Sequence, residues 1–338
     1  APRVSLTLAS IDTVSCFGGT DGKITVTGGG GTAPYTYSIN GGAGQSSPVF
    51  TSLAAQTYTI GLVDAHGCDT TISVTVPQPS AITIALVTKR DVFCNGGNNG
   101  MIQVVGSGAN DIYQYSKDGV TFQSADSFSN LTAGTYTITV KDRKSCTTTL
   151  NVTLTEPSLL DLVFVSSTPP KCYKGNDGQI VVNATGGTLA YNYALDYGVN
   201  QAGGTFNVVS SGAHTAIVTD GNGCVDSLSI NVSQPNAVRG DTLRTNAVSC
   251  FGGNDGGIVL AVSGGIYPYS YSWLQIPTES DSIATNLTAG TYTVIVSDQN
   301  ACTDTVITQV LQPTKLAPSI VTLDSVSCFG GNDGGITL

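Results

Sequence analysis

Cysteine is the residue whose type and spacing most directly suggest chemistry in this chain. The 338 residues include nine cysteines, and the intervals between them alternate between 52 and 26 residues without deviation. They are Cys16, Cys68, Cys94, Cys146, Cys172, Cys224, Cys250, Cys302 and Cys328. With no C-x-x-C pair and only two histidines, a zinc site is not expected. We therefore predict structural disulfides and an oxidising, extracellular compartment.

The spacing allows two disulfide patterns. We favour bonds within each repeat, namely Cys16–Cys68, Cys94–Cys146, Cys172–Cys224 and Cys250–Cys302, which leave Cys328 without a partner. This pattern requires an even number of strands between the two cysteines, so that both lie at the same end of a repeat. An odd number would separate them. The late cysteine of one repeat would then meet the early cysteine of the preceding repeat, as in Cys16–Cys146.

Neither histidine suggests catalysis. His214 stands at an inward strand position where the other repeats have Tyr58, Tyr136 and Tyr292, so we expect a core residue. His66 lies in a loop at a position that the other repeats fill with Lys144, Asn222 and Asn300, which is typical of a solvated loop tip. No Ser/His/Asp arrangement can be assembled from these residues, and we expect no enzymatic activity.

Aspartates recur at two loop positions, where clustered oxygens could bind calcium. The first position holds Asp21, Asp177, Asp255 and Asp333, and the second holds Asp64, Asp142, Asp220 and Asp298. The second repeat replaces the first of these with Asn99, which keeps a turn but loses the charge. We therefore favour Asx turns and expect no metal or cofactor. The glycine-rich loop CFGGNDG lacks the Lys-Ser/Thr of a phosphate-binding loop and runs into a predicted strand.

These residues are positioned by a repeat of 78 residues. Pro79, Pro157, Pro235 and Pro313 close successive repeats. We place repeats at residues 1–79, 80–157, 158–235 and 236–313, followed by the start of a truncated fifth at 314–338. Because residue 338 falls inside a predicted strand, we expect the chain to be part of a longer array.

Each repeat is predicted to contain six or seven short strands and no helix. Apolar and polar residues alternate with period two near residues 4–8, 24–27, 35–39, 49–53, 58–62 and 72–76. This pattern indicates an all-β fold of tandem immunoglobulin-like β-sandwiches. The short, proline-containing linkers predict stiff joints and an extended rod.

Composition excludes several classes of protein. The net charge of −10 disfavours nucleic acid or anionic membrane as a partner. No apolar run reaches the length of a transmembrane helix. Aromatic residues follow the early cysteine in four repeats, and we expect them to pack between repeats or to bind carbohydrate. They are Phe17, Tyr173, Phe251 and Phe329.

The repeat resembles the SprB-type repeat of Bacteroidetes surface adhesins. The resemblance rests on CFGGNDGGI at 250–258, GGIYPYSY at 264–271, LTAGTYTVIVSDQNAC at 287–302 and the closing Gln312-Pro313, and it covers the whole chain. Repeats two and three depart from it, with Ile112 and Ala190 in place of the proline before tyrosine.

This resemblance implies a cell-surface protein exported by the type IX secretion system and active in gliding motility. We expect a non-enzymatic, force-bearing stalk that reaches extracellular surfaces or polysaccharide through the full-length protein, with anchoring to outer-membrane motility machinery outside this chain. The alternative is an array in which every repeat binds weakly. The resemblance also implies O-glycosylation at Asp-Ser/Thr sites. The candidate acceptors are Thr13, Thr70, Ser227, Thr242, Ser282, Thr305 and Ser325.

Overall fold

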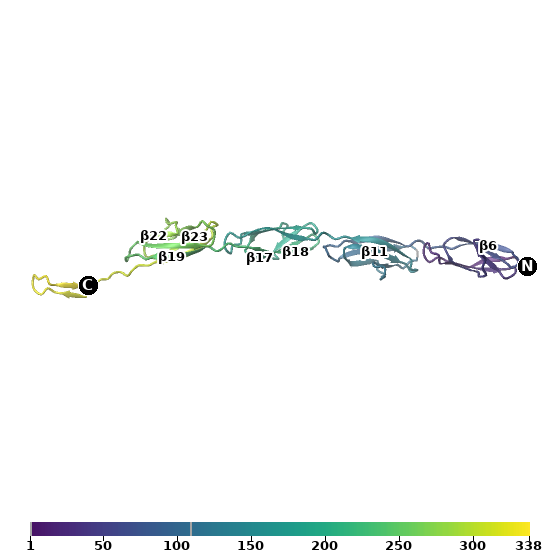
Figure 1. Ribbon diagram of the computed structural model, residues 1–338, viewed down its shortest axis with the longest axis horizontal. Coiled ribbons are helices and arrows are strands. Elements are labelled where there is room, and N and C mark those ends of the chain that lie inside the picture. Colours follow the sequence, from purple (N-terminus) through teal and green to yellow (C-terminus); the bar gives the residue numbers. More distant parts are fainter. Residues whose placement is uncertain (1, 109) are drawn as a thin grey trace. The chain divides into compact units, whose positions relative to one another are not determined.

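The computed structural model describes residues 2–108 and 110–338, and the predicted repeats at 1–79 and 80–157 each include one residue outside this part. Every regular element in it is a β-strand (Figure 1). Within the same residues, no helix has the length and apolar character needed to cross a bilayer. The chain forms two compact units. The first is Ala1–Leu160 with Gly186–Thr188 and Gly221–Cys224, and the second is Asp161–Thr185, Leu189–Asp220 and Val225–Leu338.

The first repeat forms two three-stranded antiparallel sheets. Its strands are β1 (Ser5–Asp12), β2 (Gly22–Gly29), β3 (Thr36–Ile39), β4 (Val49–Leu53), β5 (Thr57–Val63) and β6 (Asp69–Thr75). One sheet has the order β1-β2-β4 and the other β3-β5-β6, so both the first and the last strand lie at a sheet edge. In β1 a bulge between Leu8 and Ser10 shifts the register against β2.

The next three repeats have the same topology. The second consists of β7 (Thr83–Arg90), β8 (Gly100–Ser107), β9 (Gln114–Ser116), β10 (Ser127–Leu131), β11 (Gly134–Lys141) and β12 (Thr147–Leu154). The third consists of β13 (Asp161–Thr168), β14 (Gly178–Thr185), β15 (Asn192–Leu195), β16 (Thr205–Val209), β17 (Gly212–Thr219) and β18 (Val225–Val232). The fourth consists of β19 (Arg239–Asn246), β20 (Gly256–Ser263), β21 (Ser270–Trp273), β22 (Ile283–Leu287), β23 (Gly290–Ser297) and β24 (Thr303–Val310).

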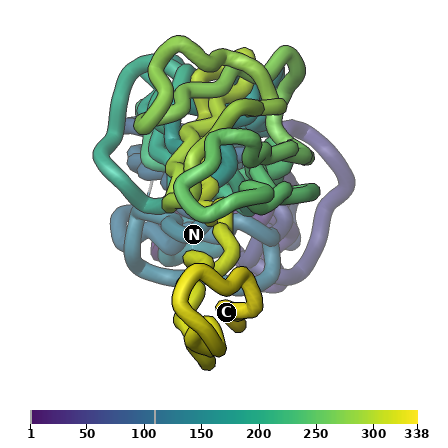
Figure 2. Tube along the Cα trace, turned by 90° about the vertical axis from the view of Figure 1, so that its left-hand side faces the viewer, coloured from purple at the N-terminus to yellow at the C-terminus, as the bar shows by residue number. Residues whose placement is uncertain are grey.

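The remaining residues form one hairpin of β25 (Thr322–Asp324) and β26 (Gly335–Thr337), drawn in yellow in Figure 2. It has the first two strands of a repeat without their partners. Its apolar side chains, such as Leu323 and Ile336, are therefore exposed.

The core of each repeat lies between its two sheets and follows the alternation of the sequence. In β2, Ile24 and Val26 are buried, whereas the threonines beside them are more exposed. Ile60 and Leu62 of β5 face them from the other sheet and are fully buried. Residues at every second position point to the same face, so one half of each strand supplies the core. The predicted all-β sandwich fold is confirmed.

A short extended segment adds one more pass to the sheet of β3. Tyr37 and Gln45 exchange two backbone hydrogen bonds of 2.8 Å as an isolated antiparallel bridge. Tyr115–Gln123 and Tyr193–Gln201 repeat this bridge in the second and third repeats. The Gln45 side chain also donates to the carbonyl oxygens of Ser47 and Val49, which holds the segment against the start of β4.

Candidate functional site: the cysteine junctions

The disulfides join neighbouring repeats, and the favoured pairing within repeats is wrong. Sulfur–sulfur bonds connect Cys16 to Cys146, Cys94 to Cys224, and Cys172 to Cys302, each across 130 residues of sequence. The Cα–Cα distances of 5.5–5.6 Å are ordinary for a disulfide. Cys68 and Cys250, which we predicted to be bonded, are free and exposed, as is Cys328.

The reason is the number of passes the chain makes between the two cysteines of a repeat. Between Cys16 and Cys68 lie β2, β3, β4 and β5, and the segment at Gln45 makes a fifth pass. Five is odd, so the cysteines lie at opposite ends. Hydrogen bonds mark these ends: the Gly18 amide donates to the side chain of Gln78 in the linker that leaves the repeat, and the Gly31 amide donates to Pro2 where the chain enters.

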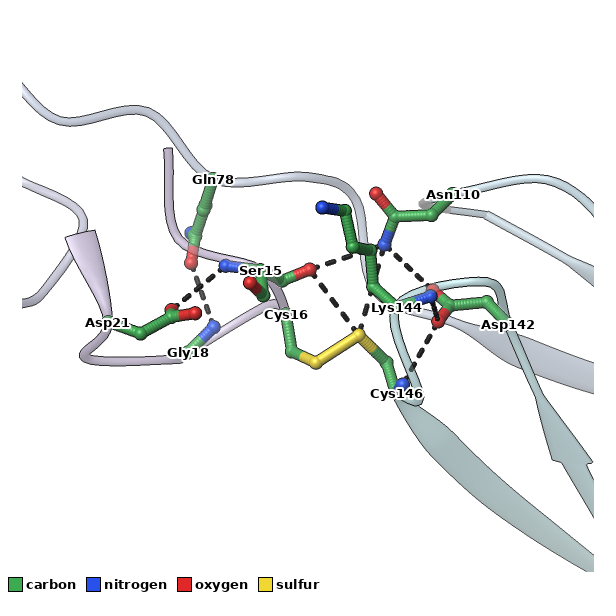
Figure 3. The surroundings of a disulfide bond; sticks show 9 residues. All are labelled: Ser15, Cys16, Gly18, Asp21, Gln78, Asn110, Asp142, Lys144 and Cys146. Carbon is green, nitrogen blue, oxygen red and sulfur yellow. Dashed lines mark hydrogen bonds between the residues drawn. A yellow bond between two sulfur atoms is a disulfide. The ribbon is translucent and has the colours of Figure 1, made fainter. Parts of the chain in front are cut away.

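The early-cysteine loop is held by two side chains (Figure 3). The carboxylate of Asp21 accepts the Ser15 amide at 2.9 Å, and Gln78 Oε1 accepts the Gly18 amide at 2.9 Å. The hydrogen bonds from Ser15 hold the pKa of Asp21 below its ordinary value. This carboxylate braces its own loop by accepting an amide six residues before it, whereas the predicted Asx turn would bond to the amide two residues after it.

The closing glutamine is a positioning residue that sequence reasoning missed. Its position recurs every 78 residues, and the Gln or Glu there accepts an amide of the early-cysteine loop in each repeat. Gly96 donates to Glu156, Lys174 to Gln234 and Gly252 to Gln312. The recurrence of Gln or Glu immediately before the linker proline was the available signal.

The late-cysteine loop is built around a buried aspartate. Asp142 is buried, and one of its oxygens accepts the amides of Lys144 at 2.8 Å and Cys146 at 2.9 Å (Figure 3). Asp298 makes the same bonds to Asn300 and Cys302. In the first repeat, backbone hydrogen bonds, led by those from Thr32 and Cys68, lower the pKa of Asp64. In the second and fourth repeats the aspartate thus holds the backbone amide of the cysteine whose sulfur bonds to the preceding repeat.

An asparagine side chain crosses each bonded junction beside the disulfide. Asn110 Nδ2 donates to the Ser15 carbonyl oxygen at 3.2 Å and to Asp142 at 2.8 Å (Figure 3). At the other two junctions Asn222 donates to Phe93 and Asn300 to Lys171, at 3.0 and 3.2 Å. Asn222 is exposed and Asn300 partly exposed, as expected of a loop tip, but both side chains also donate a hydrogen bond across the junction. In the second repeat this loop position is Lys144, and the side-chain amide that bonds across the junction comes instead from Asn110 in another loop.

The aromatic residues lie at the junctions but remain largely exposed. Phe17 lines a depression together with Ala81, Ile82 and Ser145, and 58% of it is exposed. Tyr173 lines a similar depression with Ala237 and Val238 and is 45% exposed. Phe251 is 52% exposed, and Phe329 is fully exposed on the C-terminal hairpin. Packing between repeats stays a prediction, with the aromatic rings suitably placed but not buried.

The remaining candidates have structural surroundings. His214 is a buried residue whose two ring nitrogens lie 2.7 Å from Asp196 and 2.9 Å from the Ser210 carbonyl oxygen, which confirms its place in the core. Across residues 2–108 and 110–338, no three His, Cys, Asp or Glu side chains cluster as a metal site.

None of the predicted glycosylation acceptors is buried. Thr13, Ser227, Thr305 and Ser325 are exposed, whereas Thr70, Thr242 and Ser282 are partly exposed. Two of the aspartates that precede them have another role. Asp226 accepts the Leu162 amide and Asp304 the Gly240 amide, at 2.7 and 2.8 Å, which joins the last strand of a repeat to the first.

Comparison with solved structures returns chains of several β-domains. Eight N-terminal Ig domains of the Down syndrome cell adhesion molecule align with 92% of this chain at 12% identity and a TM-score of 0.34, and the chain spans half of that fragment. Invasin, a bacterial integrin-binding protein, aligns with 96% of this chain and 82% of its own at 12% identity and a TM-score of 0.34. These scores are too low to support any argument about function. No curated protein sequence matches.

The family comparison is specific. The family model described as "SprB repeat" matches four times, at residues 8–44, 86–121, 165–200 and 242–278. The starts of these matches are 77 to 79 residues apart, so one match falls in each sandwich. Each matched segment contains the early cysteine and its glycine loop. The chain therefore carries four SprB repeats, one in each sandwich, and these support a repeat region of a surface protein of the adhesin type.

Proposed function

We propose that this array is a non-enzymatic, force-bearing stalk in a large cell-surface adhesin. The observation that carries the proposal is the double covalent connection between successive repeats. At each of the first three junctions a peptide linker and a disulfide run in parallel, as with residues 76–82 and Cys16–Cys146. A connection that only had to keep binding domains together would not need the second bond.

The family supports a wider setting for this stalk. SprB-type repeats occur in gliding-motility adhesins, so we propose export by the type IX secretion system and a role in surface attachment or gliding. Anchoring to outer-membrane machinery and contact with polysaccharide or other surfaces would belong to the full-length protein. The exposed Asp-Ser/Thr sites make the chain a candidate glycoprotein, which intact-mass analysis of native material would test.

One observation favours the alternative of a multivalent binding array. Phe17, Tyr173 and Phe251 present half-exposed rings at equivalent positions, and aromatic faces are suitable for stacking on sugars. Three weak sites on one chain would give an avidity well above that of one site.

Deletion of whole repeats separates the two functions. Removing residues 80–235 in frame takes out two repeats and leaves Cys16 in register with Cys302. If the array is a stalk, cells that carry the shortened protein keep their attachment to a given surface, because the binding region is untouched. If each repeat binds, attachment falls steeply with repeat number. A steep fall at unchanged surface expression would refute the stalk.

A further inference from the structure

The three disulfides have a topological consequence that reaches beyond any single junction. In every sandwich the early cysteine follows the first strand and the late cysteine precedes the last strand. In the second repeat, for example, β7 leads to Cys94 and Cys146 leads into β12. Since each bond joins an early cysteine to a late one, it joins the first strand of one repeat to the last strand of the next.

Two continuous covalent routes result, which we call rails. Rail A runs along β1, crosses from Cys16 to Cys146, and follows β12 and the linker into β13. It then crosses from Cys172 to Cys302 and follows β24. Rail B runs along β6 and the linker into β7, crosses from Cys94 to Cys224, and follows β18 into β19. Each rail passes through a sandwich on a single strand and alternates between peptide and disulfide at successive junctions.

Hydrogen bonds fasten the two rails to each other within the sandwiches. In the second repeat, Lys89 Nζ of β7 donates to the Thr153 carbonyl oxygen of β12 at 2.8 Å. In the third, the Leu162 amide of β13 donates to Asp226 of β18, and in the fourth the Gly240 amide of β19 donates to Asp304 of β24. The other four strands of each sandwich lie in sequence between its early and its late cysteine, so they belong to neither rail.

We propose that the disulfides make this array a covalent ladder that cannot lengthen by unfolding and that survives a single break in its backbone. Each disulfide encloses 129 residues, because its cysteines are 130 apart in sequence. The two bonds of rail A therefore withhold 258 of the 338 residues when the chain is pulled by its ends. The 80 residues that bear the load are largely strands and linkers that are already extended.

The same connectivity protects against cleavage. Any peptide bond between Cys16 and Cys302 lies inside at least one disulfide-closed loop, because the three loops overlap. One cut there opens a loop without separating the chain. The exposed turn around Tyr197 and Val199, 84% and 93% exposed, lies inside two loops at once. This property does not depend on what the full-length protein binds, so it stands or falls separately from the stalk proposal.

Single-molecule force–extension on the whole chain, held at its two ends, tests the ladder. Reduction with dithiothreitol is expected to add the contour of about 258 residues, or roughly 900 Å at about 3.5 Å per residue. Two matched variants separate the rails. Cys16→Ser with Cys146→Ser opens rail A. The shortest covalent path between the chain ends then runs through both remaining disulfides, and the variant is expected to add about 104 residues of contour, or roughly 360 Å. Cys94→Ser with Cys224→Ser removes an equivalent bond from rail B and is expected to add nothing.

Equal lengthening in the two variants, or long unfolding steps in the oxidised wild type, would overturn the proposal. A second test needs no force. A specific protease site inserted after Val199 is cut, and the product is run with and without reductant. One full-length band without reductant and two fragments with it are expected. The control site after Leu316, 90% exposed and outside all three loops, must release its fragment in both lanes. Release from the Val199 site without reductant would refute the ladder.

Discussion

The stability of the third repeat should depend on pH through a histidine that the other repeats lack. His214 Nε2 lies 2.9 Å from the Ser210 carbonyl oxygen, and Nδ1 lies 2.7 Å from the carboxylate of Asp196. Both neighbours are hydrogen-bond acceptors, and only the doubly protonated ring can donate to both. At the same position Tyr58 and Tyr292 donate one hydroxyl hydrogen bond, to Ala54 and Thr288.

The sign of the effect follows from the surroundings of the ring. Burial acts to lower the pKa of His214, but the hydrogen bonds to Asp196 and Ser210 and the negative charge of Asp196 outweigh it, so the pKa is raised above 6.5. A group whose pKa is raised on folding stabilises the fold fully below its unfolded pKa. That contribution is lost as the pH rises through the folded pKa. The third repeat should therefore be most stable in mildly acidic solution.

The magnitude is set by one charge-assisted hydrogen bond to a half-exposed partner. Hydrogen bonds to charged groups contribute about 1.5–3 kcal/mol. The Asp196 side chain is 51% exposed, so solvent screening reduces this to about 1–2 kcal/mol. Since about 1.4 kcal/mol is a factor of ten in an equilibrium constant, the opening of β17 should become about 5- to 30-fold more favourable between pH 5.5 and pH 9.

Hydrogen exchange by mass spectrometry on the whole chain measures this, with amide rates corrected for pH. Peptides from β11 and β23, which carry tyrosine at this position, provide the internal control. His214→Tyr should remove the pH dependence. Asp196→Asn should also remove it, because Asn40 already holds the equivalent turn in the first repeat by accepting the Thr59 amide at 2.9 Å. If the amide protection of β17 changed with pH in the same way as that of β23 between pH 5.5 and pH 9, the reasoning would be refuted.

Three further predictions follow from local geometry. Gly264→Ala should destabilise the fourth repeat by more than about 3 kcal/mol in chemical denaturation, because its Cβ would collide with the Ala237 carbonyl oxygen. Gly252→Ala, with a similar positive φ but open space around it, should cost only about 1–2 kcal/mol, and equal costs would contradict this account. Asp298→Ala leaves the amides of Ile266, Asn300 and Cys302 without their acceptor, so we expect about 2–4 kcal/mol lower stability and less Cys172–Cys302 in peptide maps after oxidative refolding. Because the loop aspartates cap backbone amides, EDTA should leave the melting temperature unchanged, and a fall of many degrees would show a metal that the loops do hold.

Much of the fold could be read from local patterns. The alternation at Ile24 and Val26, or at Ile60 and Leu62, reports which face of a strand is buried, and that depends on neighbours within a few residues. The repeated glycine loop and the tyrosine position are also local, which is why His214 could be assigned to the core. The closing glutamine was visible as a repeat but not as a contact, because its partner loop lies 60 residues earlier.

The sequence by itself determined the 78-residue period, the sandwich fold and the use of the cysteines as staples. Only the tertiary structure decided which cysteines meet, because pairing depends on the number of passes the chain makes across a repeat. One bridge between Tyr37 and Gln45, too short to show a strand pattern, changes that number from four to five. It places Cys68 at the opposite end from Cys16 and sends each bond across a junction. Local periodicity cannot reveal such a parity, since it is a property of the whole path of the chain.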